Sequence, residues 1–324
     1  MRAAVLASYG DAPRVDERPA PVAVGGKAVV ELLAAALNPA DLAIASGTFP
    51  AGSPPLPYVP GIEGVGRVVE SGRFAPGTRV WASGRGLGVA ADGTFSELFA
   101  AAEEALFPVP DAVDDAVAAA FGQVGLAAWM PLTWLAPVRD GETVLVLGAS
   151  GNVGTVAVQA AKLLGAGRVV AVGRDEARLA AVAGLGADAT VALEGEDLRD
   201  RLAAACEGAP PTLVIDTLWA EPLEAATAVA GAGARFVHLG QSAGSSATLA
   251  SGLVRGKQLQ ILGYSNFAVP ADVLARGYAE IVGHAAAGRI RLATRVLPLD
   301  QVEGAWEQQR GPRDAKIVLV PGTS

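Results

Sequence analysis

The pattern of apolar and polar positions is clearest between Thr143 and Val172. A short apolar strand is followed by a glycine-rich turn, then by apolar residues at helical spacing, and then by a second apolar strand. Similar apolar runs recur downstream between alanine-rich helical stretches, at Thr190–Leu193, Thr212–Asp216, Arg235–Leu239 and Gln258–Leu262. The alternation predicts an α/β fold with a doubly wound, six-stranded parallel sheet, and a ligand at the carboxyl ends of its strands.

The rest of the chain has a different pattern. Residues 1–122 contain short β-type runs separated by Gly- and Pro-rich turns, among them Ala28–Leu33, Gly64–Glu70 and Thr78–Trp81. Residues 265–324 contain a helix around Val273–Ala285, a short strand near Arg295–Leu297, a helix from Asp300 and a final strand over Lys316–Val320. We expect a β-rich first domain, a second domain over residues 123–264, and a return of residues 265–324 to the first domain, with the active site in the cleft between the two domains.

The glycine-rich turn GASGNVG at residues 148–154 predicts a dinucleotide site. Ala149, Gly151 and Gly154 occupy the positions of a G-x-G-x-x-G motif, and alanine at the first position still permits a tight turn. Small residues let the backbone approach a ligand, and the unpaired N–H groups that begin the next helix attract a pyrophosphate. The predicted cofactor contacts in this turn are Ala149, Ser150, Gly151, Asn152, Val153 and Gly154.

The end of the second strand indicates which dinucleotide binds. Gly173 stands where an acidic residue would bind the 2′-hydroxyl of NAD, and Arg174 follows as a donor suited to a phosphate. We therefore predict NADPH as the cofactor, with Gly173 and Arg174 in contact with it. Asp175 weighs against a 2′-phosphate unless it is the N-cap of a helix beginning at Glu176.

Residues at the ends of the later strands are further candidates. Those expected to contact the cofactor, or else to be plain turn residues, are Asp216, Thr217, Leu239, Gly240 and Gln241. Trp129, Trp134 and Trp219 either line an aromatic acceptor pocket or belong to the core, and the core is the commoner place for tryptophan. His238 is either structural or faces the cofactor from a strand end.

Composition narrows the function further. The chain has 324 residues and a net charge of −8, with scattered basic residues, which argues against nucleic acid or an acidic membrane as the main partner. A single cysteine, Cys206, excludes an internal disulfide, and the two histidines, His238 and His284, lie far apart with no close Cys or His, so no metal site is expected. No secretory signal is recognisable after Met1, and the expected location is cytoplasmic.

Five segments together resemble the medium-chain dehydrogenase/reductase superfamily. They are LNPADLAIASGTFP (37–50), PGIEGVGRVVESG (60–72), DGTFSELFA (92–100), GASGNVG (148–154) and AKIVLVP (315–321). The resemblance implies a GroES-like catalytic domain, formed by residues 1–122 and 265–324, around a Rossmann NADP-binding domain over residues 123–264.

Within that superfamily, the zinc-dependent branch carries a cysteine at the position of Asn38 and a histidine at the position of Ile62, next to Glu63. The chain is most similar to the zinc-independent quinone oxidoreductase branch, whose members share Asn-Pro-x-Asp, here Asn38 to Asp41. This resemblance implies an NADPH-dependent, metal-free reductase of a quinone or an α,β-unsaturated carbonyl, with Asn38 and Asp41 as the catalytic candidates near nicotinamide and substrate. The alternative for Asp41 is a helix or turn cap.

Two alternative functions remain open. An enoyl-thioester reductase of a lipid or polyketide pathway resembles this chain, but related enoyl reductases carry a proton-donating tyrosine at the position of Phe49, so Tyr58 or a water would have to replace it. A non-catalytic NADPH-binding sensor is consistent with the few acid/base candidates.

Further features implied by the resemblance concern phosphate binding and association. Relatives often have a tyrosine near the adenosine phosphate where this chain has Leu193. Arg310 is similar to an arginine that reaches the 2′-phosphate in some relatives, or else is an exposed charge at a helix end. The sixth strand leaves a sheet edge through which a homodimer is expected, as in relatives.

Overall fold

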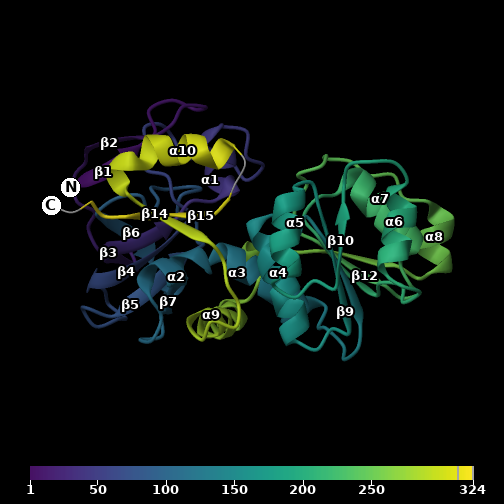
Figure 1. The fold of residues 1–324 in the computed structure, drawn as a ribbon. Helices are drawn as coiled ribbons and strands as arrows, with labels where there is room; N and C mark the ends of the chain where they lie inside the picture. Colours follow the sequence, from purple (N-terminus) through teal and green to yellow (C-terminus); the bar gives the residue numbers. More distant parts are fainter. Residues whose placement is uncertain (312–313, 323–324) are drawn as a thin grey trace. The chain divides into compact units, whose positions relative to one another are not determined.

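The computed structural model describes residues 1–311 and 314–322, which form two compact units (Figure 1). We call Val124–Val269 with Arg289–Arg291 the α/β unit. The β-rich unit comprises Met1–Gln123, Pro270–Gly288 and the described residues from Leu292 onward. Within the described part of the chain, no helix combines the length and apolarity needed to cross a bilayer.

The α/β unit contains the predicted parallel sheet. Its strand order is β10-β9-β8-β11-β12-β13, and every neighbouring pair is parallel. The strands are β8 (Thr143–Leu147), β9 (Arg168–Gly173), β10 (Ala189–Ala192), β11 (Leu213–Asp216), β12 (Arg235–His238) and β13 (Gln260–Gly263). The chain runs from β8 to one edge and then returns to the other side of β8, so the order reverses between β8 and β11, where this class of sheet binds its ligand.

Helices cover both faces of this sheet, as predicted. In Figure 1, α4 (Asn152–Leu163) and α5 (Glu176–Ala183) lie on one side, and α6 (Leu198–Ala205) and α7 (Ala220–Val229) on the other. The remaining helical segments here are α3 (Gln123–Met130), a π-helical turn over Pro131–Leu135, α8 (Ser251–Gly256) and a 3-10 turn over Asn266–Ala268. Gly165, with φ of +94°, follows α4 in the left-handed conformation typical of a residue after a helix end.

The β-rich unit is built on a seven-stranded sheet with the path β14-β15-β3-β4-β5-β7, and β6 pairs with β3. These strands are β3 (Lys27–Ala36), β4 (Glu63–Glu70), β5 (Arg79–Ser83), β6 (Leu98–Ala102), β7 (Leu106–Pro108), β14 (Thr294–Pro298) and β15 (Lys316–Val320). A separate pair joins β1 (Arg2–Val5) and β2 (Arg14–Glu17). Since β15 pairs antiparallel with β3, the end of the chain completes the sheet that its first part begins.

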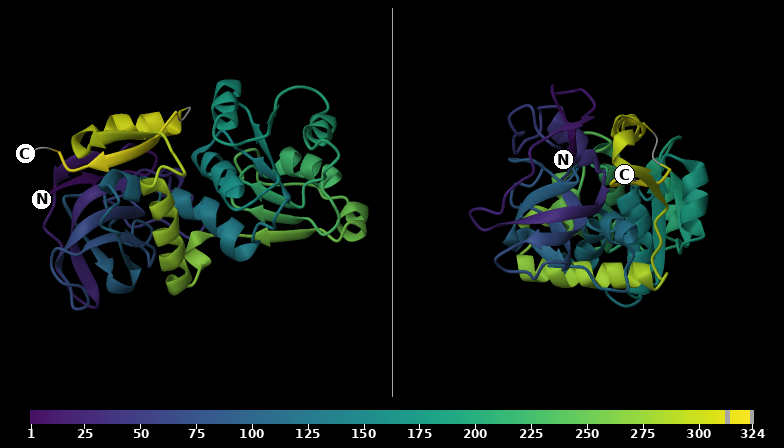
Figure 2. Two further views of the ribbon diagram at one scale, coloured as in Figure 1. Left: turned by 60° about the horizontal axis from the view of Figure 1, so that its bottom comes forward. Right: turned by 90° about the vertical axis from the view of Figure 1, so that its left-hand side faces the viewer.

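The described residues of the β-rich unit also form four helices, α1 (Pro39–Ala45), α2 (Asp115–Ala120), α9 (Ala271–Ala286) and α10 (Val302–Arg310), with 3-10 turns over Glu103–Ala105 and Leu299–Gln301. Figure 2 shows α10 beside β14 and β15, which it contacts. Tyr278 of α9 stacks on Trp81 of β5 at 4.6 Å between ring centroids and donates a hydrogen bond to the Ala118 carbonyl at 3.1 Å. These contacts bring the late segments of the chain into the core of the first domain.

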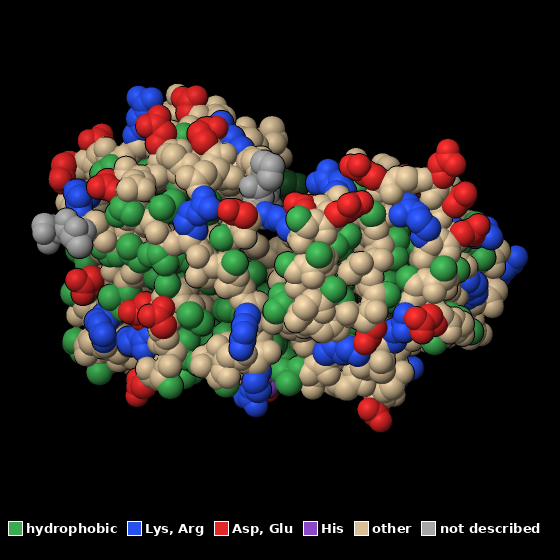
Figure 3. Space-filling model, in the orientation of Figure 1, with side chains coloured by type: hydrophobic (Ala, Val, Ile, Leu, Met, Phe, Trp, Pro, Cys, Tyr) green, Lys and Arg blue, Asp and Glu red, His purple; other side chains and the backbone are tan. Residues whose placement is uncertain are grey.

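Charged side chains are mixed over the surface. On the face shown in Figure 3, Lys and Arg side chains alternate with Asp and Glu side chains in both units. Among the described residues on that face, no extended basic area is present of the kind that follows a nucleic-acid backbone.

Candidate functional site

The turn after β8 requires glycine at two positions, Gly148 and Gly154. Gly148 has a φ of +87°, and a β-carbon there would lie 2.1 Å from Thr217 Oγ1. A β-carbon at Gly154 would lie 2.3 Å from the Gly148 carbonyl oxygen and 2.5 Å from Ala149 Cα. Glycine at position 154 therefore lets α4 begin directly against the turn, as a close-packed dinucleotide motif needs.

The N-terminus of α4 has unused hydrogen-bonding capacity. Gly151 is its N-cap and offers no side chain to the first N–H groups. A β-carbon at Gly151 would meet only the Gly148 carbonyl oxygen, at 3.3 Å, so the space beside it is otherwise open. The N–H groups and the positive dipole end of this 12-residue helix are features of the kind that binds a pyrophosphate.

The end of β9 lies against the same turn. A β-carbon at Gly173 would lie 2.6 Å from Ser150 Oγ, which brings these two predicted contacts together. Arg174 is exposed. Asp175 is the N-cap of α5, since its Oδ1 accepts a hydrogen bond from the Arg178 backbone N–H at 3.1 Å, which confirms the capping interpretation. Its carboxylate therefore has a structural role at the start of α5.

Arg178, which the sequence analysis did not single out, contacts the glycine turn. Its Nη1 donates to the Ser150 carbonyl at 3.2 Å, and its Nε lies 3.4 Å from Asp175 Oδ2. This guanidinium therefore rests against the glycine turn and supplies a second positive charge beside Arg174. The available signal was its place in the first turn of α5, four residues after Arg174.

The loops after β11 and β12 are neighbours. The Leu239 N–H donates to the Asp216 carbonyl at 2.8 Å, and a β-carbon at Gly240 would lie 3.0 Å from the Thr217 carbonyl oxygen. Thr217 Oγ1 donates to the Leu147 carbonyl at 2.9 Å, which links this edge to β8. The structure thus brings Asp216, Thr217, Leu239, Gly240 and the adjoining Gln241 to one edge of the sheet, although Asp216 itself is wholly buried.

Arg310 lies in the β-rich unit at the end of α10. Its Nη1 donates to Glu307 Oε1 at 2.9 Å and its Nη2 to the Gly10 carbonyl at 2.6 Å. Both contacts are local to that unit, and a role for Arg310 toward the 2′-phosphate stays a prediction.

Asn38 is at the centre of a buried polar cluster in the β-rich unit. Its Nδ2 donates to the Ala36 carbonyl at 3.0 Å and to Glu63 Oε1 at 2.8 Å, while its Oδ1 accepts from Lys316 Nζ at 2.6 Å. Glu63 Oε2 accepts from Trp81 Nε1 at 2.9 Å and from the Gln123 N–H at 2.7 Å. Lys316 is 1% exposed and also donates to the Leu37 carbonyl at 2.9 Å. The cluster therefore joins β3, β4, β5, β15 and the start of α3 around a buried ammonium and a buried carboxylate.

Asp41 joins this cluster from α1. Its Oδ2 accepts from the Asn38 N–H at 2.7 Å and its Oδ1 from the Ile62 N–H at 2.9 Å, so both oxygens serve backbone groups. Burial raises the pKa of Asp41 to about 7, against the opposing effect of these two hydrogen bonds and of Lys316. The geometry is that of a helix cap that also ties α1 to the residue before β4, and a catalytic role for Asp41 stays a prediction.

The raised pKa of Asp41 predicts a pH-dependent contribution to stability. Because the folded state holds this proton more tightly than an unfolded chain with a pKa near 3.8, the contribution is complete below about pH 4 and is lost as the pH rises through about 7. We expect the difference in unfolding free energy between the wild type and Asp41→Asn to be smaller at about pH 8 than at about pH 5. Denaturant unfolding of both proteins at the two pH values measures it, and an equal difference at both would contradict the assignment.

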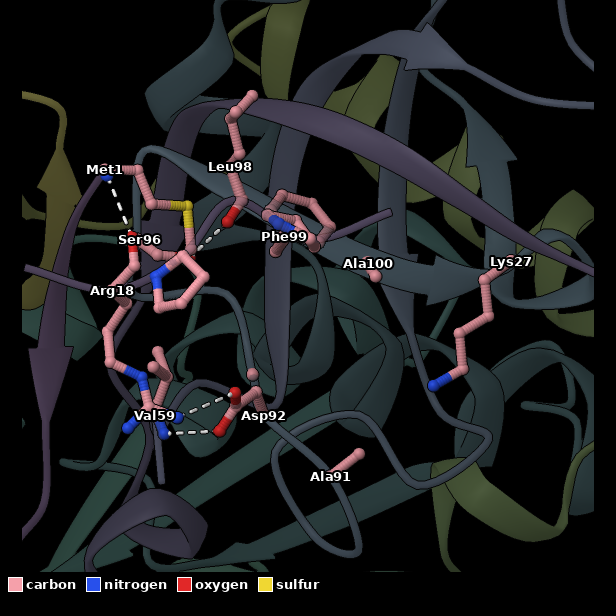
Figure 4. Close-up of a pocket in the computed structure, with 13 residues that line it drawn as sticks. Met1, Arg18, Lys27, Val59, Ala91, Asp92, Ser96, Leu98, Phe99 and Ala100 are labelled. Carbon is pink, nitrogen blue, oxygen red and sulfur yellow. Dashed lines mark hydrogen bonds and ion pairs between the residues drawn. The ribbon is translucent and has the colours of Figure 1, made fainter. Parts of the chain in front are cut away.

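A pocket of about 380 Å³ lies elsewhere in the β-rich unit (Figure 4). Arg18 and Asp92 line it as an ion pair with 3.6 Å between Nη2 and Oδ2, and the Val59 N–H donates to Asp92 Oδ1 at 2.8 Å. None of the site residues predicted from the sequence lines this pocket. The pocket therefore shares no lining residue with the glycine turn or with the Asn38 cluster.

Comparisons with known proteins agree with this arrangement. Residues 25–111 match the family model of the alcohol dehydrogenase GroES-like domain, and residues 152–274 match that of the zinc-binding dehydrogenase. One subunit of the phenolphthiocerol/phthiocerol polyketide synthase of Mycobacterium tuberculosis is 30% identical over 217 residues, which cover 67% of this chain and 10% of that protein. A quinone oxidoreductase of Pongo abelii is 34% identical over 149 residues, 45% of this chain and 44% of that protein.

Among solved structures, one described as an NAD-dependent alcohol dehydrogenase is 29% identical. It aligns with a TM-score of 0.87 and covers 99% of this chain and 100% of that one. The chain thus spans a tenth of the first of the two curated relatives and less than half of the second, while it aligns with the whole of that solved chain.

Proposed function

Because the chain belongs to the medium-chain dehydrogenase/reductase superfamily and is quinone oxidoreductase-like, we propose that it transfers hydride from NADPH to a quinone or an α,β-unsaturated carbonyl. The observation that carries the proposal is the glycine turn at the start of α4, where a β-carbon at Gly154 would collide with backbone. The dinucleotide, when bound, supplies the hydride from its nicotinamide ring. The α4 N-terminus would hold its pyrophosphate, and Arg174 and Arg178 would favour a 2′-phosphate.

The residues of the Asn38 cluster do not fit the zinc that one family model's name implies. A catalytic zinc needs about three Cys, His or carboxylate ligands, whereas Asn38 is an amide and Ile62 is apolar. The Glu63 carboxylate already accepts from Asn38, Trp81 and the Gln123 N–H, and the Lys316 ammonium supplies a positive charge to the cluster. A site without a Lewis acid suits acceptors that delocalise the added charge themselves, as quinones and conjugated carbonyls do.

An enoyl-thioester reductase is the second candidate, favoured by the identity with the polyketide synthase. Phe49, partly buried against the core, cannot donate a proton. In this candidate Tyr58 would have to supply the proton in place of a tyrosine at position 49. The Tyr58 hydroxyl is buried with no hydrogen-bond partner among the described residues. Burial raises the pKa of Tyr58, so this hydroxyl keeps its proton at neutral pH. Faster turnover of a crotonyl thioester than of any quinone would favour this candidate, and loss of that activity in Tyr58→Phe would assign the donor.

The experiment that tests the proposal is a titration of the protein with NADPH and NADH, followed by turnover with benzoquinone, phenanthrenequinone and a simple enone. Tight NADPH binding with loss of reduced-nicotinamide absorbance is the expected result. Binding without turnover of any acceptor would support the NADPH-binding sensor instead, and absence of binding would overturn the cofactor assignment.

Removal of the positive charge of Arg174, which follows β9, should lower the preference for NADPH over NADH. We expect Arg174→Ala to weaken NADPH binding by about tenfold to a hundredfold, because a charge-assisted hydrogen bond to phosphate contributes about 1.5–3 kcal/mol, and to leave NADH binding nearly unchanged. Calorimetric titration with both cofactors measures the two affinities. Arg199→Ala is the control, since Arg199 is an exposed arginine of the same unit paired with Asp200; an equal loss in both variants would contradict a specific role.

We also propose that the chain forms a homodimer through β13, the edge strand of the α/β sheet. Among the described strands β13 pairs only with β12, and Ile261 on it is 37% exposed. We expect Ile261→Lys, which places a charge on this edge, to convert a dimer into a monomer in light scattering after size exclusion. A monomeric wild type would overturn the proposal. A cytoplasmic location stays a prediction.

A further inference from the structure

An aspartate and a histidine form a hydrogen-bonded pair at the carboxyl edge of the α/β sheet. Asp216 ends β11 and His238 ends β12, and the two residues are register partners in neighbouring parallel strands. Asp216 Oδ2 lies 3.1 Å from His238 Nδ1. Partners in register project toward the same face, so the contact follows from the sheet itself.

The carboxylate of this pair cannot turn away from the histidine. Asp216 is wholly buried, and its Oδ1 accepts from the Leu218 N–H at 2.8 Å and from the Trp219 N–H at 2.9 Å. With one oxygen held by two backbone donors, the other is fixed toward the imidazole. A carboxylate that binds Nδ1 in this way favours the tautomer with the proton on Nδ1.

Trp219 holds the imidazole from a second direction. The two ring centroids are 4.1 Å apart with the planes inclined by 45°. Trp219 itself has a φ of +64°, and a positive φ is costly for a large side chain and persists only where surrounding contacts demand it. Such strain is concentrated at functional sites, where it sets the position of a side chain.

The second ring nitrogen of His238 remains available. The His238 side chain is 28% exposed, unlike that of Asp216, and among the described residues Asp216 is the hydrogen-bond partner of its ring. With the proton on Nδ1, Nε2 is an acceptor. The contact with buried Asp216 therefore fixes the orientation of His238 Nε2, which packing alone does not require.

The place of the pair in the sheet identifies its ligand. The glycine turn follows β8, and Arg174 and Arg178 lie after β9, on one side of the point where the strand order reverses. β11 and β12 lie on the other side. In sheets of this kind the dinucleotide extends across that point, so a molecule with its adenosine phosphate beside β9 presents its nicotinamide nucleoside to the ends of β11 and β12.

We propose that His238 is a cofactor-binding residue whose Nε2 accepts a hydrogen bond from the nicotinamide nucleoside, either from a ribose hydroxyl or from the carboxamide N–H, and that Asp216 is the positioning residue. The inference rests on the proposed dinucleotide-binding function and deepens it. The sequence analysis predicted direct contact between Asp216 and the cofactor, whereas in this proposal Asp216 acts on the cofactor through His238.

Nuclear magnetic resonance of the full chain labelled in histidine tests this inference. The chain has two histidines, so its ring spectrum has two sets of signals, and His284→Gln identifies those of His238. We expect nitrogen shifts typical of the Nδ1–H tautomer, and a change in the His238 signals on addition of NADPH but not of an adenosine bisphosphate that lacks the nicotinamide nucleoside. His284 signals should not change.

Different outcomes separate the two proposals. Calorimetry that detects no NADPH binding overturns the proposed function and this inference with it. NADPH binding with unmoved His238 signals, the Nε2–H tautomer, or an equal change with the adenosine bisphosphate overturns only the inference. His238→Gln should weaken NADPH binding by about threefold to tenfold without loss of folding, the range expected for one hydrogen bond, and should leave binding of the adenosine bisphosphate unchanged.

Discussion

Gly154→Ala should remove dinucleotide binding and destabilise the α/β unit. The new β-carbon would lie 2.3 Å from the Gly148 carbonyl oxygen and 2.5 Å from Ala149 Cα, and both are backbone atoms that cannot move aside cheaply. We expect an affinity loss of more than about a hundredfold, because displacing α4 from the turn misdirects all the N–H groups that would face the pyrophosphate. Calorimetric titration with NADPH and a thermal unfolding curve measure the two effects.

Gly151→Ala is the matched variant. Its β-carbon would meet only the Gly148 carbonyl oxygen, at 3.3 Å, so folding should be nearly preserved while the methyl group enters the space where the ligand approaches. We therefore expect weakened binding with an almost unchanged melting temperature. If Gly154→Ala bound NADPH as well as the wild type, the turn would not be the cofactor site.

Lys316→Met should have the largest effect on stability in the β-rich unit. The substitution removes a buried ammonium that donates to Asn38 Oδ1 and to the Leu37 carbonyl. Burial raises the pKa of Glu63, and the substitution also removes the positive charge that opposes this rise. Removing a buried charge that offsets a buried charge of opposite sign costs about 3–5 kcal/mol, because the remaining charge stays desolvated without compensation. Denaturant unfolding of the full chain measures the loss.

Lys257→Met is its control. Lys257 Nζ also donates to three carbonyls, those of Thr227, Ala228 and Ala230 at the end of α7, but it is only partly buried and has no carboxylate partner among these contacts. A cation at a helix C-terminus contributes about 0.3–1 kcal/mol. Equal losses in the two variants would show that the buried charges of the Asn38 cluster add nothing to the contribution of Lys316.

The hydrogen bonds that join Asn38, Glu63 and Lys316 limit what Asn38 can contribute to the proposed hydride transfer. Asn38 keeps its side-chain amide engaged with Glu63 and Lys316, so a substrate would meet a preorganised surface and not a free amide. We expect its contribution to a reaction to lie in holding α1 and the loop before β4 in place. Asp41 contributes to the same frame through the Asn38 and Ile62 N–H groups.

The sequence by itself determined the features that depend on local pattern. Periodicity located all six strands of the α/β sheet, because alternating buried strands and amphipathic helices leave a repeating apolar signature. The turn from Gly148 to Gly154 and the N-cap at Asp175 were likewise recognisable, since glycine spacing and capping residues act within a few positions of one another.

Only the tertiary structure decided which distant residues share a site. Lys316 meets Asn38 across 278 positions of sequence, His238 meets Asp216 across 22, and Arg178 reaches back 28 positions to Ser150. Each contact is created by strand pairing or by the packing of a helix against a turn, and no local pattern of residue types encodes it. The physical reason is that hydrophobic burial sets the strand order, and the strand order then places polar side chains that are unrelated in sequence within hydrogen-bonding distance.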